Sequence, residues 1–255
     1  MRTTRRAVLG AAAAGALGIG FGTTAPARAS EKGLRPEEGL QPEKGIQVAV
    51  LLYDGFTALD AVGPYETLCR LPGVRVFTVA RRTGPVRTDT GQLALAAERS
   101  LSDVRRADVL VVPGGGNRGI IAAMDDAALL DWIRRLHQHT TWTTSVCTGS
   151  LLLASAGLLK GLPATTYWAS RPYLEKLGAV MAPGRFVETG KIITAAGVSA
   201  GLDMGLHLAA RLSDEATARA MQLAIEYDPH PPFDSGSPEK ADEATRRLAL
   251  KLVEG

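Results

Sequence analysis

The sequence predicts an α/β domain whose sheet is mostly parallel and is covered by helices on both faces. Short apolar, β-branched runs alternate along the chain with segments of helical periodicity. The first apolar run is nearly continuous, which is typical of a strand that is buried on both faces of a parallel sheet. About 226 residues follow residue 29, enough for one domain of this class with a sizeable core.

The N-terminal segment predicts export. Residues 1–29 contain Arg5-Arg6 ahead of an Ala-, Gly- and Leu-rich stretch, and Ala27-Arg28-Ala29 provides a small-x-small cleavage site. This is the layout of a twin-arginine signal peptide. We therefore expect the mature chain to begin near Ser30, to lack stable membrane insertion, and to work in the extracellular or periplasmic/cell-wall space.

The rest of the chain divides into a linker and a domain. Residues 30–45 are charged, contain Gly and Pro at regular intervals and lack apolar periodicity, so they predict a flexible linker. Residues 46–255 are expected to form a single domain. Without residues 1–29 the chain has 25 basic and 26 acidic residues, a net charge of −1. Because no basic run is interleaved with aromatic residues, nucleic-acid binding is not expected.

The first half of the domain contains three predicted strands and two predicted helices. The apolar run Ile46–Leu52 predicts the first strand, and a loop leads from it into a helix over about residues 58–71. β-Branched runs predict strands at Val74–Ala80 and Asp108–Val112. Apolar residues at helical spacing predict a helix at Asp125–His139.

The second half begins with a strand at Thr141–Val146, which leads directly into a helix from Cys147 to about Ala156. Short strands are expected near Ala164–Thr166, Arg185–Glu188 and Ile192–Ala195. Two helices follow, near Ser199–Leu212 and Asp214–Tyr227. In a sheet of this class, ligands are expected beyond the carboxyl ends of the strands.

The C-terminal tail is predicted to be extended and then helical. Residues 226–236 cannot form a helix, because Pro229, Pro231 and Pro232 fall within four residues. We expect an extended arm that lies over the domain or over a partner subunit. A polar terminal helix is expected at residues 238–253.

The strongest chemical signal is Cys147. A strand rich in Thr and Val meets a turn of small residues there, and an apolar helix starts at once. This is the shape of the nucleophile elbow of hydrolases. In that interpretation Gly149 permits close backbone approach, and the helix N-terminus lowers the pKa of the thiol. The alternative is a buried structural cysteine, because a free Cys packs as a small hydrophobic residue.

A second signal is the glycine run Gly114-Gly115-Gly116, which follows Val111-Val112-Pro113 at the end of a buried strand. Consecutive glycines there can direct backbone N–H groups toward a developing negative charge. An ordinary Gly-rich turn is the alternative. A phosphate-binding loop is not supported, since no Lys-Ser/Thr pair follows.

A third signal is Asp60, an acid with apolar neighbours just beyond the first strand. It should lie at the same sheet edge as Cys147, where burial would raise its pKa and let it hold or deliver a proton. A helix cap or a first-turn dipole partner is an equal alternative. Glu66 is a candidate second acid, although a solvated helix position is the preferred interpretation.

Metal and disulfide chemistry are not indicated. The histidines are His137, His139, His207 and His230, and no Cys/His cluster has ligand spacing, so no metal site is expected. The only other cysteine is Cys69. Two cysteines do not make a disulfide framework, and a single Cys–Cys bridge remains open from the sequence.

Several segments together resemble the PfpI-type branch of the class I glutamine-amidotransferase-like superfamily, over roughly residues 46–238, and most closely the isonitrile hydratases. The segments that carry the resemblance are Thr57-Ala58-Leu59-Asp60 with Gly63-Pro64, Pro113-Gly114-Gly115-Gly116, Ser145-Val146-Cys147-Thr148-Gly149-Ser150, Ala164-Thr165-Thr166 with Trp168-Ala169-Ser170, Gly197-Val198-Ser199-Ala200-Gly201-Leu202-Asp203, and the tail from Glu226-Tyr227-Asp228-Pro229 to Gly236. The resemblance implies a flavodoxin-like three-layer sandwich, a homodimer and catalysis without a cofactor.

The resemblance also implies residue roles. Cys147 matches the nucleophile, Asp60 the acid that contacts it, and Thr148 a further functional residue. The backbone N–H groups of Gly115 and Thr148 match the oxyanion-hole positions. Candidate pocket residues around them are Glu66, Gly114, Gly116, Tyr167 and Trp168.

One departure from the family pattern concerns Tyr167. Relatives commonly carry His at this position, so a Cys–His pair of the glutaminase or protease kind lacks its obvious base here. His207 or His230 could replace it only if the fold brought one of them close. This weakens amide hydrolysis and favours a Cys–Asp mechanism.

The resemblance implies hydration of a small neutral isonitrile to an N-substituted formamide. The enzymatic alternative is a glyoxalase, deglycase or amidase that uses the same Cys147. The non-enzymatic alternative is a ligand-binding or redox-sensing protein, since AraC-type regulators carry a similar module. The absence of a following helix-turn-helix region and the expected export weigh against a transcriptional role.

Overall fold

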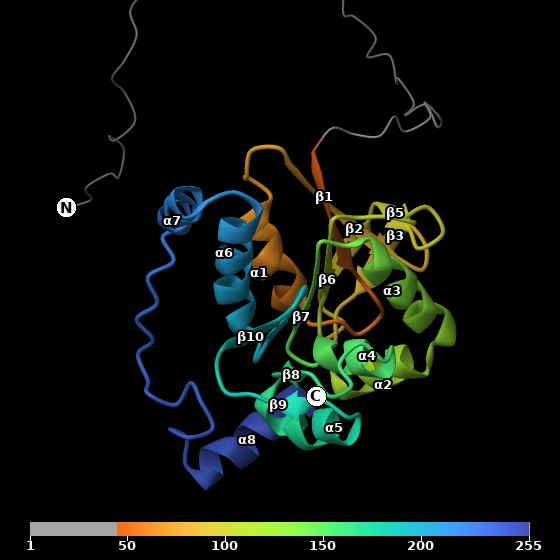
Figure 1. The fold of residues 1–255 in the computed structure, drawn as a ribbon. Coiled ribbons are helices and arrows are strands. Elements are labelled where there is room, and N and C mark those ends of the chain that lie inside the picture. The colour runs from red at the N-terminus through yellow and green to blue at the C-terminus, as the bar shows by residue number, and fades with distance from the viewer. Residues whose placement is uncertain (1–44, 255) are drawn as a thin grey trace, which may run out of the picture. The chain divides into compact units, whose positions relative to one another are not determined.

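The computed structural model describes residues 45–254 (Figure 1). The predicted signal at 1–29 and nearly all of the linker at 30–45 lie outside the described residues. The centre of the fold is a sheet of seven strands in the order β10-β11-β7-β6-β1-β2-β5. Their bounds are β1 (Ile46–Leu51), β2 (Val74–Ala80), β5 (Arg99–Ser100), β6 (Val109–Val112), β7 (Trp142–Val146), β10 (Phe186–Thr189) and β11 (Ile192–Ala195).

The sheet is parallel except at one edge, as predicted. β1 pairs in parallel with both β2 and β6, and β7 pairs in parallel with β6 and β11. Only the edge strand β10 runs antiparallel, against β11. β6 is buried along its whole length, which explains why its sequence is a continuous apolar run.

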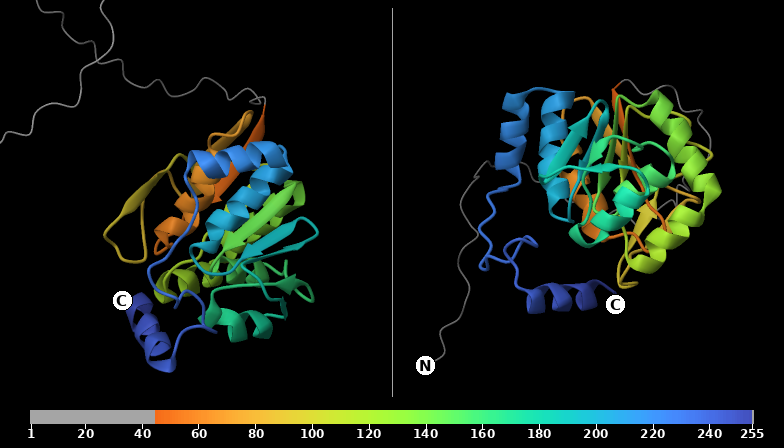
Figure 2. Two further views of the ribbon diagram at one scale, coloured as in Figure 1. Left: turned by 90° about the vertical axis from the view of Figure 1, so that its left-hand side faces the viewer. Right: turned by 60° about the horizontal axis from the view of Figure 1, so that its bottom comes forward.

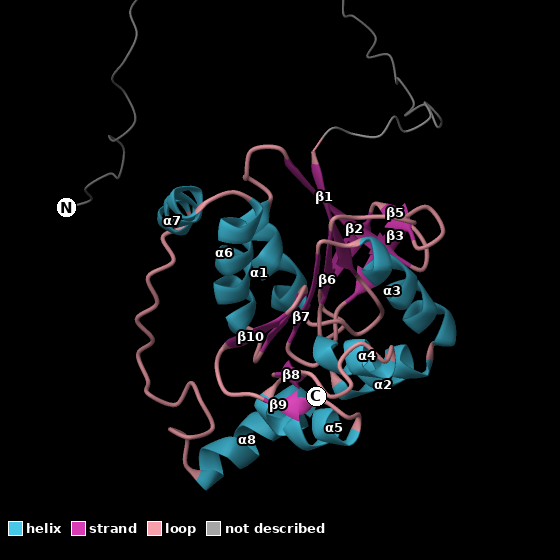
Figure 3. Cartoon of the chain, in the orientation of Figure 1, coloured by secondary structure: helices cyan, strands magenta, loops and turns pink. Residues whose placement is uncertain are grey.

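Helices cover both faces of the sheet (Figure 3). One face carries α1 (Ala58–Leu68), α6 (Ala200–Leu212) and α7 (Glu215–Ala224). The other carries α2 (Asn117–Asp125), α3 (Ala127–His139) and α4 (Gly149–Ser155). α1 and α6 approach closely at Gly205, where a Cβ would lie 2.1 Å from Oγ1 of Thr67. This arrangement confirms the predicted three layers.

Smaller elements complete the described chain. A hairpin of β3 (Gly84–Arg87) and β4 (Ala94–Ala97) follows β2, and a short parallel pair joins β8 (Pro163–Ala164) to β9 (Val180–Met181). Two short helices lie between β8 and β9: the 3₁₀ helix η1 (Trp168–Ser170) and α5 (Arg171–Lys176). The arm that follows α7 has no helix before α8 (Glu243–Glu254), and Figure 2 shows its extended path. No helix within residues 45–254 has the length and apolarity that crossing a membrane requires.

The structure shortens several predicted helices. The first ends at Leu68 rather than residue 71, and the terminal helix starts at Glu243 rather than 238. The helix predicted from Cys147 starts at Gly149, because Cys147 has a positive φ of 56° that no α-helix accommodates. Asp126 and Asp214 are N-caps whose carboxylates accept N–H bonds from the first turns of α3 and α7.

Several elements were not predicted: α2, the β3–β4 hairpin and the short elements β5, η1, α5 and β9. α2 begins directly after the glycine run, and its short amphipathic sequence is interrupted by Gly119. The β3–β4 hairpin has four-residue strands, which give too short an alternating pattern to recognise. The turn of this hairpin reaches the candidate site, because Asp89 in the turn accepts a hydrogen bond from Thr57.

Candidate active site

The predicted catalytic segments meet at one edge of the sheet. β1, β6 and β7 are neighbours, so the chain that follows each of them emerges at the same carboxyl edge. Thr57 donates its N–H to the carbonyl of Gly114 at 2.9 Å, which joins the first two segments. The carbonyls of Val112 and Pro113 lie 2.2 and 2.8 Å from where a Cβ of Gly149 would be, so the third segment requires glycine there, as predicted.

Cys147 occupies a strained elbow between β7 and α4. Its positive φ of 56° is unusual for a non-glycine residue and costs about 1–3 kcal/mol. Hydrogen bonds hold the turn on both sides: the Cys147 N–H donates to the carbonyl of Ala195 at 3.1 Å. The Cys147 carbonyl accepts from Oγ1 of Thr166 at 3.0 Å and from Oγ of Ser150 at 3.2 Å. The side chain is buried, and the geometry agrees with the predicted nucleophile elbow.

Asp60 is a fully buried carboxyl group in the first turn of α1. Its Oδ2 accepts the N–H of Gly114 at 2.9 Å, whereas Oδ1 has no hydrogen-bond partner. The pKa of Asp60 is raised to about 7, chiefly because the carboxyl group is buried. The hydrogen bond from Gly114 lowers this pKa, the charge of Asp89 raises it, and the hydrogen bond with the Cys147 thiol lowers it. The predicted placement and the predicted direction of the pKa are both confirmed.

The expectation that the pKa of the Cys147 thiol is lowered is wrong for this state of the protein. Burial raises the pKa of the Cys147 thiol well above its usual value, and the charge of Asp60 raises it further. Hydrogen bonds from the backbone and side chain of Thr148 lower it by less. At Cys147 the desolvation of a thiol beside a carboxylate outweighs the lowering expected from the helix N-terminus.

Thr148 connects the elbow to the glycine run. Its Oγ1 accepts the N–H of Gly115 at 2.9 Å and donates to the Gly115 carbonyl at 3.1 Å. Both predicted oxyanion donors therefore have partners in this state: the Gly115 N–H bonds the Thr148 hydroxyl, and the Thr148 N–H faces the Cys147 sulfur. Their role in stabilising an oxyanion stays a prediction. At Gly114, a Cβ would lie 2.6 Å from Thr148 N and 2.8 Å from Asp60 Oδ2, so this residue lines the centre of the site.

Tyr53 is a residue of the site that the sequence analysis missed. It lies two residues after the end of β1, and its buried hydroxyl donates to the carbonyl of Pro113 at 3.1 Å. Burial raises its pKa well above the usual value, and the charges of Asp60 and Cys147 raise it further. Tyr53 could have been predicted from its position immediately after the first predicted strand, because ligands bind beyond the carboxyl ends of parallel strands and Asp60 was located in this way.

Asp89 is the second missed residue. It lies in the turn between β3 and β4, and its Oδ2 accepts the Thr57 hydroxyl at 2.6 Å. It approaches the glycine run as well: a Cβ on Gly116 would lie 3.0 Å from the Cβ of Asp89. No signal in the sequence pointed to this contact, because it depends on a hairpin that was not predicted.

The remaining pocket candidates divide into two groups. Tyr167 is half-buried beside the site, where burial raises its pKa and the charge of Cys147 raises it further. Its ring packs against Trp168 at 5.5 Å, and Trp168 also lines a pocket formed with residues 235–238 and α8. Glu66 lies elsewhere: it pairs with Arg70 at 2.5 Å on the solvated side of α1. Its inclusion in the pocket was wrong, and the solvated alternative is confirmed.

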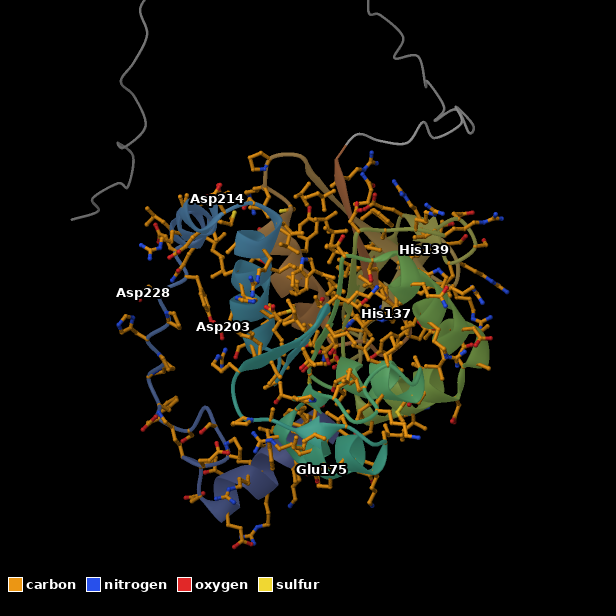
Figure 4. The ribbon with its side chains drawn as sticks, in the orientation of Figure 1. His137, His139, Glu175, Asp203, Asp214 and Asp228 are labelled. Carbon is orange, nitrogen blue, oxygen red and sulfur yellow. The ribbon has the colours of Figure 1, made fainter. Side chains whose placement is uncertain are left out.

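The histidines have other partners. His207 bonds Glu188 of β10 at 2.5 Å, and His230 is an exposed residue of the arm. His137 and His139 belong to α3 (Figure 4), and His137 bonds Thr143 at 2.8 Å. None of the four is among the groups that shift the pKa of Cys147. The site therefore has a Cys–Asp pair rather than a Cys–His pair.

No metal site is evident within residues 45–254, where no group of three or more His, Cys, Asp or Glu side chains is placed to hold an ion. Cys69 and Cys147 are both free thiols. The chemistry that these residues themselves offer is nucleophilic attack by sulfur, coupled to proton transfer by a carboxyl group whose pKa lies near neutrality.

The chain is similar in sequence to several known proteins. The sequence pattern of the DJ-1/PfpI family matches residues 46–211. The isonitrile hydratase of Pseudomonas putida is 43% identical over 211 residues, which cover 81% of this chain and 91% of that protein. The HTH-type transcriptional regulator CdhR of Pseudomonas aeruginosa is 30% identical over 183 residues, which cover 69% of this chain but 52% of the regulator.

A solved structure shows the same fold. The crystal structure of a ThiJ/PfpI family protein from Pseudomonas syringae superposes with a TM-score of 0.78 at 39% sequence identity. The match covers 88% of this chain and 93% of that one.

Proposed function

The chain belongs to the DJ-1/PfpI family, and we propose that it is an isonitrile hydratase, a hydro-lyase that converts R–N≡C to R–NH–CHO with Cys147 as its nucleophile. The similarity to the Pseudomonas putida enzyme over most of both chains supports this activity. The single structural observation that carries it is the buried pair of Cys147 and Asp60. One carboxyl oxygen of that pair has no hydrogen-bond partner.

The first step adds the thiol across the terminal carbon of the isonitrile. That carbon is electrophilic and becomes basic as the S–C bond forms. The Asp60 carboxylate removes the thiol proton as sulfur attacks, and the resulting carboxylic acid delivers the same proton to the carbon. The product is a thioimidate, R–N=CH–S–Cys147. A pKa of about 7 suits Asp60 to both transfers, because either protonation state is accessible at neutral pH.

The second step hydrolyses the thioimidate. Asp60, again a carboxylate, removes a proton from a water molecule as its oxygen attacks the imidate carbon. The carboxyl proton then passes to nitrogen, which gives R–NH–CH(OH)–S–Cys147. Loss of the Cys147 sulfur, with return of the hydroxyl proton to it, releases the formamide and restores both residues. The sum is addition of one water molecule, with no change in oxidation state of the enzyme.

The raised pKa of the Cys147 thiol is consistent with these two reaction steps. A free thiolate would need no base, but the proton for carbon would then have to come from Asp60 already in its acid form. A neutral thiol beside a carboxylate carries the proton that the carbon requires. Because burial opposes charge at both residues, a small neutral substrate suits the site.

We also propose that the enzyme is exported and dimeric. Export is supported by the Arg5-Arg6 motif and the Ala27-Arg28-Ala29 cleavage pattern. Self-association is supported by the family resemblance, which implies a homodimer. Export is tested by fusing residues 1–29 to a reporter that is active only when it is exported in the folded state. Dimerisation is tested by sedimentation.

The catalytic proposal is tested with a panel of small alkyl and aryl isonitriles, methylglyoxal and small amides. Isonitrile hydration predicts formamide formation without turnover of the other substrates. Turnover of methylglyoxal or an amide alone would instead support the glyoxalase, deglycase or amidase alternative. Ready oxidation of Cys147 without turnover of any substrate would support a sensor.

A further inference from the structure

The β3–β4 turn brings an exposed acidic residue against the buried site. Asp89 donates its N–H to the carbonyl of Phe56 at 3.0 Å, and Gly55 donates to the carbonyl of Arg87 at 2.9 Å. The segment that follows β1 is thereby held between the hairpin and the glycine run, since the Gly116 N–H bonds the Gly55 carbonyl at 3.1 Å. Asp89 is thus fixed in place by the backbone, although its side chain is exposed.

The side chain of Asp89 is connected to Asp60 through Thr57. Thr57 is the N-cap residue of α1, and its hydroxyl makes no capping bond because it donates to Oδ2 of Asp89. The backbone N–H of Thr57 bonds the carbonyl of Gly114, whose own N–H bonds Asp60. Asp89 therefore helps to set the position at which the helix carrying Asp60 begins.

The charge of Asp89 also acts on the site. It raises the pKa values of Asp60, Cys147 and Tyr53, and it is the one exposed group that affects all three. The groups that face Asp60 from the surrounding elements are Cys147 from the elbow, Tyr53 from the end of β1 and Asp89 from the hairpin. Within residues 45–254, no lysine, arginine or histidine is among the groups that shift the pKa of Asp60 or Cys147.

We propose that Asp89 is a positioning and selectivity residue of the Cys147 site: it fixes the start of the helix that carries Asp60, and its negative charge discriminates against anionic substrates. This inference deepens the proposed function and rests on it where isonitriles are concerned. It assigns neutral and cationic isonitriles as the substrate class and predicts poor turnover of isonitriles that bear a carboxylate.

Two variants separate the charge of Asp89 from its hydrogen bond. Asp89→Asn removes the charge, while its amide can still accept from Thr90 N and donate to the Thr57 hydroxyl. Thr57→Val keeps the charge and removes the bond. Glu98→Gln is the matched control, because it removes one exposed negative charge that does not act on the site.

The first measurement is kcat/KM for an aryl isonitrile bearing a methyl ester and for the corresponding carboxylate, at low ionic strength. Asp89→Asn should raise the carboxylate-to-ester ratio about 3- to 10-fold, and added salt should reduce this gain. The pH profile of the ester reaction should also move to lower pH in Asp89→Asn, because the pKa of Asp60 falls. Glu98→Gln and Thr57→Val should leave the ratio unchanged. An unchanged ratio in Asp89→Asn, or an equal change in Glu98→Gln, would overturn the inference.

The second measurement does not require isonitrile turnover. Iodoacetamide and iodoacetate differ in charge and alkylate the same thiol, and peptide mass spectrometry reports Cys147 and Cys69 separately. Asp89→Asn should raise the iodoacetate-to-iodoacetamide rate ratio at Cys147 and leave that at Cys69 unchanged. If the wild type hydrates no isonitrile but the alkylation ratio moves in this way, the proposed function fails while the role of Asp89 stands. An equal ratio in wild type and variant would overturn that role.

Discussion

Gly114 donates its N–H to Oδ2 of Asp60 at 2.9 Å, and this bond leaves Oδ1 as the carboxyl oxygen without a partner. The bond fixes the orientation of an acid that has no contact with solvent. It favours the ionised form, yet burial outweighs it, so the pKa of Asp60 is about 7. The glycine run thus prepares Asp60 for proton transfer beside Cys147, in addition to its predicted role as a source of N–H donors.

Asp60→Asn should abolish most of the activity without unfolding the protein. The amide preserves the shape of the side chain but cannot take the thiol proton or deliver it to carbon. We expect kcat/KM for an isonitrile to fall by about 10²–10⁴. Asp125→Asn, an exposed acid at the end of α2, is the matched control and should retain activity. Full activity in Asp60→Asn would refute the proton-transfer role.

The same variant should change how stability depends on pH. The pKa of Asp60 is raised from 3.8 to about 7 in the folded protein, so the folded state holds its proton more tightly than the unfolded state does. This residue therefore makes the protein less stable as pH rises from about 4 to 7, and the loss is complete above pH 7. Relative to wild type, Asp60→Asn should gain about 2–4 kcal/mol in free energy of unfolding at pH 8 and little at pH 4. Urea denaturation of both proteins at pH 4 and pH 8 measures this gain. If the variant and the wild type differed by the same free energy of unfolding at both pH values, the assigned pKa would be contradicted.

Thr148→Val should impair the site through its hydroxyl. Valine has a similar shape but leaves the N–H of Gly115 without the acceptor that it now has at 2.9 Å. We expect a loss of about 1–2 kcal/mol in stability and a fall of roughly 10- to 100-fold in kcat/KM. Thr148→Ser retains the hydroxyl and should recover most of the stability and most of the kcat/KM. Equal activity in the Val and Ser variants would show that the hydroxyl has no part in the reaction.

Gly114→Ala should damage both the acid and the elbow. The added Cβ would lie 2.6 Å from Thr148 N and 2.8 Å from Asp60 Oδ2, distances at which the backbone must move. We expect at least about a 100-fold loss of activity, because small displacements of reacting groups are costly. Gly236→Ala, whose Cβ would meet nothing within 4 Å, serves as the control in both circular dichroism and activity measurements. Undiminished activity in Gly114→Ala would contradict the packing of the site.

The sequence predicted those parts of the fold whose signals are local and strong. β2 and β11 have the predicted bounds because apolar β-branched runs end at clear turns. The placement of Asp60 and Cys147 at one edge followed from parallel strands alone. The elbow was recognisable because small residues interrupt a strand that leads into an apolar helix.

What the sequence could not show depended on tertiary packing. The pKa of Cys147 is governed by its burial beside Asp60, a contact between residues 87 positions apart in the chain. Asp89 reaches Thr57 only through the β3–β4 hairpin, whose strands are too short to give a periodic signal. Glu66 was misplaced because its position on α1 faces solvent, where Arg70 pairs with it one turn later.

Formation of the formamide in cysteine variants tests the central claim most directly. Cys147→Ala and Cys69→Ala each remove one of the two free thiols, so each controls for the other. With a simple alkyl isonitrile, we predict turnover in the wild type and in Cys69→Ala, and none above background in Cys147→Ala. Formamide production by folded Cys147→Ala, or none by the folded wild-type protein, would contradict the account.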